Sequence, residues 1–162
     1  MSPALSFFVP GTPAPGGSKS AFPIFRKGPA GENVFVRSII TDAAGQKNKD
    51  WRANVGWTGR EAMGKAGLRP FAGPLEVSFA FTMPRLKSHR KPNGELRGNA
   101  PVWHVTKPDT TKLIRSTEDA LKGIAWLDDS QIARQAGSKQ YGDSPGCLIT
   151  IRSLEILLPT LL

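Results

Sequence analysis

The sequence predicts an α+β fold, a single small domain in which a mixed β-sheet packs against two main helices. A chain of 162 residues is long enough to bury one hydrophobic core. Residues 75–81 alternate apolar and polar side chains, which is typical of a half-buried strand. Residues 41–66 and 110–122 instead place apolar side chains at helical spacing. Strands and helices that alternate along one chain indicate helices layered on a sheet.

The first half of the chain predicts a strand, an irregular segment and a helix. Residues 5–9 form an apolar strand that a Pro-Gly pair ends. Residues 10–33 are rich in proline, glycine and serine, so we expect a long basic loop or arm, with a short strand at residues 34–36. A helix over residues 41–66 follows, although its glycines weaken the pattern. Its apolar positions are Trp51, Val55, Ala62 and Ala66.

The second half repeats the alternation. Residues 75–81 give the clearest strand pattern of the chain, and residues 84–106 form a second irregular, basic stretch. The helix over residues 110–122 ends at a glycine, and residues 147–151 predict the last strand. The apolar tail, residues 156–162, is expected to extend the core or to form a dimer contact. The strand at residues 75–81 presents Leu75, Val77, Phe79 and Phe81 on one face. The whole chain, residues 1–162, is therefore interpreted as one domain.

The charge balance indicates a polyanionic partner. Lysine and arginine number 22 against 13 acidic residues, a net charge of +9 that attracts nucleic acid. No basic amphipathic helix, apolar span or signal segment is found, so we expect a cytoplasmic protein without a membrane role. No phosphate-cradling glycine loop is present either, so no nucleotide cofactor is expected.

Three aspartates form the strongest candidate for chemistry. Pro108 prevents an earlier helix start, so Asp109 falls at the helix N-terminus, where a lone aspartate is usually a cap. Asp128 and Asp129 follow an apolar run, and two adjacent carboxylates are tolerated more readily beside a cation. Magnesium binds one or two carboxylates together with water and phosphate oxygens. A site built from Asp109 and one of the paired aspartates has this composition.

Other reactive side chains are interpreted as structural. His89 and His104 are too isolated for a metal site and are expected at the surface or hydrogen-bonded. Cys147 is the only cysteine, which excludes an intramolecular disulfide, and is expected to be buried. The tryptophans are expected to pack in the core. Trp103, inside the basic stretch, is left open as a surface on which a base stacks.

The run Lys107 to Gly123 resembles the signature of the RusA family, which reads roughly K-P-D-x-D-N-L-x-K-x-x-x-D-A-L-x-G. As in that family, it is followed by Trp126-Leu127-Asp128-Asp129-Ser130-Gln131-Ile132. The flanking segments are similar more loosely, with an early Pro-Gly-x-Pro, a central helix and a late Lys-x-Tyr before the last strand.

The resemblance implies a homodimeric, magnesium-dependent endonuclease that resolves four-way Holliday junctions during recombination and repair. It implies an intertwined or closely packed dimer, with Asp109 and Asp129 as catalytic metal ligands and Asp128 beside them. Arg115 stands in the place of a lysine that assists catalysis. Thr111 stands where the family has a second catalytic aspartate, and Lys112 where it has asparagine.

Basic side chains near this motif and in the second irregular stretch are the candidate DNA contacts. They are Arg85, Lys87, Arg90, Lys91, Arg97, Lys107, Lys112 and Lys139. Two alternatives stay open. Thr111 favours a catalytically weak or inactive junction-binding protein on the same scaffold. An RNA-binding or general nucleic-acid module would show no preference for branched over linear DNA.

Overall fold

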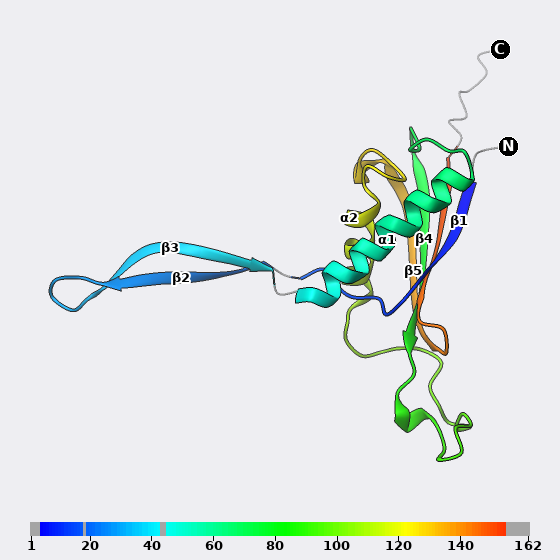
Figure 1. The fold of residues 1–162 in the computed structure, drawn as a ribbon, viewed down its shortest axis with the longest axis horizontal. Helices are drawn as coiled ribbons and strands as arrows, with labels where there is room; N and C mark the ends of the chain where they lie inside the picture. The colour runs from blue at the N-terminus through cyan, green and yellow to red at the C-terminus, as the bar shows by residue number, and fades with distance from the viewer. Residues whose placement is uncertain (1–3, 18, 43–44, 155–162) are drawn as a thin grey trace, which may run out of the picture.

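The computed structural model describes residues 4–17, 19–42 and 45–154, and its α+β architecture confirms the predicted fold class (Figure 1). A four-stranded mixed sheet is covered on one face by two helices, and a two-stranded hairpin projects from this body. The predicted apolar tail lies outside the described residues. The helices are α1 (Gly45–Lys65) and α2 (Thr110–Leu121). The strands are β1 (Ala4–Pro10), β2 (Lys19–Lys27), β3 (Asn33–Asp42), β4 (Leu75–Pro84), β5 (Ile132–Gly142) and β6 (Gly146–Ser153).

The main sheet has the order β1-β6-β4-β5, with β5 parallel to β4 and β6 antiparallel to both β1 and β4. The alternation predicted for β4 is confirmed, since its apolar side chains are buried against the helices and the intervening ones are partly exposed. Strands β1 and β6 confirm the strands predicted at residues 5–9 and 147–151. The buried side chains of β4 are Leu75, Val77, Phe79, Phe81 and Met83.

Gly59 of α1 lets the two helices approach closely, which explains why a glycine is tolerated at this position of the helix. A Cβ added at Gly59 would lie 2.6 Å from Leu121 Cδ2. Between the helices, the Trp51 indole donates to Thr117 Oγ1 at 3.1 Å, and that hydroxyl donates to the Leu113 carbonyl at 2.9 Å. The predicted helix begins at Gly45 rather than at residue 41, since residues 41 and 42 complete β3.

Strand β5 was not predicted. Most of its side chains are exposed, so the sequence lacks the apolar alternation by which a half-buried strand is recognised. It lies at the edge of the sheet, beside α2. A Cβ at Gly137 would lie 2.6 Å from Ile114 Cδ1, so this glycine allows α2 to pack close to the edge strand.

The prediction of an irregular loop over residues 10–33 is wrong for β2. Strands β2 and β3 form an antiparallel hairpin, hereafter the arm (residues 19–42), which stands away from the body (Figure 1). The short strand predicted at residues 34–36 is part of β3. The second basic stretch, residues 84–106, is irregular as predicted, apart from one 3₁₀ turn at Lys87–His89.

The predicted core is confirmed for Trp51, Trp126 and Cys147, which are buried. Burial also raises the pKa of the Cys147 thiol. The expectation is wrong for Trp57, which is 70% exposed, whereas Trp103 is exposed as its position in the basic stretch suggested. Across the described ranges, no helix combines the length and apolar character needed to cross a bilayer.

Candidate functional site

Asp109 occupies the N-cap position of α2, but its carboxylate does not cap the helix. Its backbone is extended, and its side chain accepts no hydrogen bond from the first turn. Asp109 Oδ2 lies 3.6 Å from Lys112 Nζ, and the carboxylate is 57% exposed. The lowered pKa of Lys139 results from partial burial and is opposed by the charge of Asp109, which therefore lies nearby. The carboxylate is accessible to a ligand from solvent in spite of its ion pair with Lys112.

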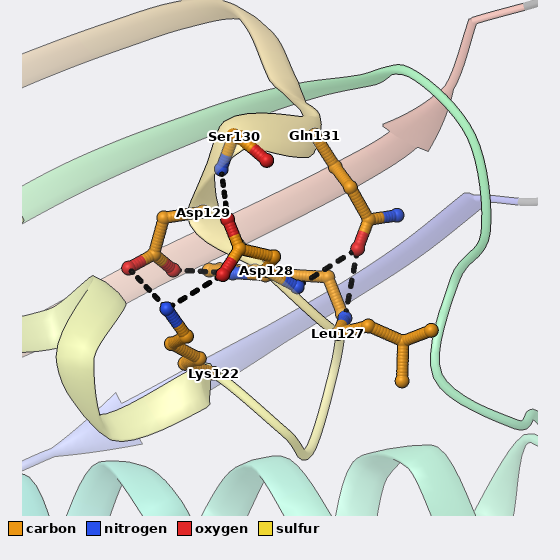
Figure 2. Close-up of polar contacts among 7 residues, drawn as sticks. Lys122, Leu127, Asp128, Asp129, Ser130 and Gln131 are labelled. Atoms are coloured by element: carbon orange, nitrogen blue, oxygen red, sulfur yellow. Dashed lines mark hydrogen bonds and ion pairs between the residues drawn. The ribbon is translucent and has the colours of Figure 1, made fainter.

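Asp128 and Asp129 follow α2 in a short turn that the sequence itself stabilises (Figure 2). Asp128 Oδ1 accepts from the Ser130 amide at 3.0 Å, while Gln131 Oε1 accepts from the Leu127 and Asp128 amides at 2.8 and 3.0 Å. Because side chain and backbone satisfy each other in this capping box, the position of the two carboxylates is well defined.

Lys122 supplies the positive charge expected beside the paired aspartates. Its Nζ lies 2.8 Å from Asp128 Oδ2 and 4.0 Å from Asp129 Oδ2, as Figure 2 shows. The hydrogen bond from Lys122, followed by those from Ser130, holds the pKa of Asp128 well below its usual range. Sequence reasoning missed Lys122, although this residue directly follows α2 and precedes Asp128 by six residues.

Asp129 is anchored on the core. Its Oδ1 accepts a hydrogen bond at 2.8 Å from the indole of Trp126, which is fully buried. The Asp129 side chain is nevertheless 35% exposed, so its other oxygen is within reach of solvent. This aspartate therefore combines a structural role, satisfying a buried donor, with an accessible negative charge.

Glu118 is an acidic residue near Asp129 that sequence reasoning did not select. Partial burial, then the charges of Asp129 and Asp119, raise its pKa to about 7. Gln135 of β5 donates a hydrogen bond to Glu118 Oε1. Glu118 lies in the last turn of α2 and Lys122 is its C-cap residue four positions later, and this i, i+4 spacing is the signal that places both side chains at the end of the helix where Asp129 lies.

Glu118→Gln is expected to stabilise the protein at pH 8 and to have little effect at pH 5. The folded chain binds a proton at Glu118 more tightly than the unfolded chain does. The free energy of unfolding of the parent therefore falls as pH rises from about 4.5 to about 7. Thermal unfolding in EDTA, at pH 5 and at pH 8, measures the difference in stability between the variant and the parent. Glu61→Gln, at an exposed glutamate of α1, is the control. An equal shift in melting temperature at both pH values would contradict the raised pKa.

The candidate aspartates lie at opposite ends of α2. Asp109 precedes its first residue, whereas Lys122, which holds Asp128 and Asp129, follows its last. A helix of 12 residues is about 18 Å long. Oxygens that share one magnesium ion lie within roughly 4 Å of each other. Within the described residues, no three His, Cys, Asp or Glu side chains are grouped closely enough to hold a metal ion. One chain thus does not assemble the predicted ligand set.

The other catalytic and DNA-contact candidates divide into two groups. Arg115, Lys107 and Lys87 are exposed, as is Thr111, while exposed Lys112 pairs with Asp109. The remainder make contacts within the chain. Lys139 Nζ donates to the carbonyls of Thr106 (2.7 Å) and Pro108, next to Asp109. Arg85 and Arg90 both pair with Asp143, Lys91 with Glu95 at 3.0 Å, and Arg97 donates to the Arg90 carbonyl.

The two histidines, expected at the surface or hydrogen-bonded, are both buried. Their rings pack on Tyr141 with centroid distances of 4.7 Å for His89 and 4.6 Å for His104. The Nδ1 atom of each ring has no hydrogen-bond partner among the described residues. Burial, then the charge of Lys139, lowers the pKa of His104. These rings attach the second basic stretch to Tyr141 of β5, which is a structural role.

Comparison with known proteins identifies the family of this chain. An 81-residue segment is 29% identical to the uncharacterized protein YqaN of Bacillus subtilis (strain 168). That match spans 50% of this chain and 57% of the Bacillus protein. The family model described as endodeoxyribonuclease RusA matches residues 35–152, which include all three aspartates and both helices. Since this match extends over well more than half of the sequence, the chain belongs to the RusA endodeoxyribonuclease family.

Proposed function

We propose that this protein is a magnesium-dependent endodeoxyribonuclease that resolves Holliday junctions and related branched DNA by paired nicks. The observation that carries the proposal is the placement of Asp109, Asp128 and Asp129. All three lie within the segment that matches the nuclease family, and their carboxylates are accessible on a chain of net charge +9. The proposal includes a role in recombination and repair of DNA. It also includes a cytoplasmic location, where the DNA substrate is expected.

A homodimer would complete the site that one chain leaves divided. If α2 of one protomer runs antiparallel to α2 of its partner, the N-terminus of each helix lies beside the C-terminus of the other. Asp109 of one protomer then approaches Asp128 and Asp129 of the other, and the two-fold axis generates two equivalent sites. A four-way junction needs two matched nicks, so two equivalent sites suit this substrate.

The chemistry proposed is hydrolysis of a phosphodiester bond. Asp109 and Asp129 would hold magnesium, and Asp128 would join them if its ion pair with Lys122 were broken. Bound there, magnesium would neutralise phosphate charge and lower the pKa of a bound water. Arg115 and Lys112 are exposed on the same helix and can stabilise the added negative charge of the transition state. Trp126 orients Asp129, and Lys139 fixes the backbone at Pro108 immediately before Asp109.

DNA affinity is proposed to come from the basic side chains near the motif and in the second basic stretch, through contacts with phosphates. Those that already pair within the chain, such as Arg90 with Asp143 or Lys91 with Glu95, are exposed enough to exchange an acidic partner for a phosphate. The test of the proposed function is nicking of a synthetic four-way junction, with a linear duplex of the same sequence as the control.

Thr111 supports a second candidate, a junction-binding protein with weak or no cleavage. A threonine hydroxyl brings no charge to the position where the family has an aspartate, so the affinity for magnesium is reduced. Thr111 is exposed in the first turn of α2, two residues after Asp109. Thr111→Asp is the variant that separates the candidates, because it restores the carboxylate without altering the core.

A further inference from the structure

The arm carries an unusual amount of exposed apolar surface. It projects from the body, away from the sheet and both helices (Figure 1). Six of its large apolar side chains are between 40% and 67% exposed, which is typical of a surface that another molecule covers. They are Phe22, Phe25, Phe35, Val36, Ile39 and Ile40.

These side chains lie on both faces of the ribbon. Phe22 is directly opposite Ile39 in the register, and such pairs share a face. Phe25 is opposite Phe35, and their rings are in edge-to-face contact with centroids 6.1 Å apart. Successive residues of a strand point to opposite faces, so Phe25, three residues after Phe22, lies on the other face of the ribbon. An isolated two-stranded hairpin is marginally stable in water, so a partner packed on the arm would stabilise it.

We infer that the arm packs against a second copy of this chain and is the principal dimer contact. With roughly half of each side chain exposed, the six offer about 100 Å² apiece, or roughly 600 Å² in all. That is most of the roughly 800 Å² that each partner buries in a stable protein interface. Two arms related by a two-fold axis bury these faces against each other or against the partner's body.

The charges on the arm favour a protein over DNA as its partner. Surfaces that bind DNA are dominated by lysine and arginine, and apolar groups contribute little to them. The arm carries four basic residues (Lys19, Arg26, Lys27 and Arg37) and two acidic ones (Glu32 and Asp42), so its net charge is only +2. The second basic stretch is the better candidate for phosphates, since five of the proposed contacts fall between residues 85 and 97.

The inference rests on the dimer proposed above and is tested on the full chain with Phe22→Ser combined with Ile39→Ser. Phe8→Ser combined with Leu148→Ser is the matched control. Phe8 and Leu148 also form a directly opposed pair of exposed apolar side chains, 42% and 45% exposed, but on β1 and β6 of the body. Sedimentation equilibrium gives the dissociation constant of the dimer, and circular dichroism shows whether each variant is folded.

The arm variant is expected to raise this dissociation constant about 100-fold or more, and the control is expected to leave it unchanged. Arg26→Ala with Arg37→Ala, on the same arm, should also dimerise like the parent. A monomeric parent, an arm variant that dimerises normally, or dissociation of the control alone would each overturn the inference. An arm variant that keeps its dimer but loses junction affinity would also overturn it and assign the arm to DNA. Nicking by the parent is measured separately, so the nuclease proposal stands or fails independently of the arm.

Discussion

Asp129→Asn is expected to reduce cleavage of a four-way junction by roughly 100- to 1,000-fold or more while junction binding is unchanged or tighter. The carboxylate is proposed to hold the metal ion, whereas affinity for DNA comes mainly from lysine and arginine contacts with phosphates. Losing one negative charge near the DNA also reduces repulsion. Nicking and electrophoretic mobility shift, measured on the same junction, give the two quantities.

The hydrogen bond from Trp126 makes the choice of substitution important. Asparagine keeps an oxygen that accepts from the indole at the position of Asp129 Oδ1, so the fold should be preserved. Asp129→Ala instead leaves a buried donor without a partner and should lower the free energy of unfolding by about 1–3 kcal/mol. Equal losses of binding and cleavage in the asparagine variant would mark Asp129 as structural.

A mixture of two inactive variants, Asp109→Asn and Asp129→Asn, is expected to recover cleavage when both chains enter one dimer. In the heterodimer, intact Asp109 of one protomer faces intact Asp129 of the other, so one complete site is restored. The second site contains both substitutions and stays inactive. Because only one site works, the heterodimer should nick the junction once and produce few paired nicks.

Coexpression with two different affinity tags allows the heterodimer to be purified, and each homodimeric variant is the control. If every site were formed within one chain, each protomer of the heterodimer would lack one ligand. A purified heterodimer that binds junctions but produces no nicks would therefore contradict the arrangement across two protomers.

The parts of the fold that the sequence predicted are those whose burial leaves a periodic pattern. Strand β4 alternates because one face packs on the helices, and α2 shows Leu113, Thr117 and Leu121 on its buried side. Strands β2 and β5 have no such pattern. β5 is exposed at a sheet edge, and β2 belongs to an arm whose apolar side chains appear on both faces.

The sequence proposed the candidate site by residue type, and the distances between its residues came only from the structure. The motif identified Asp109, Asp128 and Asp129 because carboxylates beside basic residues suit a metal ion and phosphate. A helix was also predicted over residues 110–122, between these aspartates, and the length of the observed 12-residue helix separates them in one chain. Lys122, Glu118 and Gln135 were missed because their roles depend on the way the turn after α2 and strand β5 fold back beside the helix.

The central claim is tested most directly by nicking of a synthetic four-way junction by the unaltered protein, in magnesium and in EDTA. Labels at the 5′ ends of two opposite strands show whether symmetric nicks are made near the branch point. Magnesium-dependent nicks at matched positions in both strands, with none in the linear duplex, are the predicted result. Binding to the junction without nicks at any magnesium concentration, in the parent and in Thr111→Asp alike, would contradict the nuclease function.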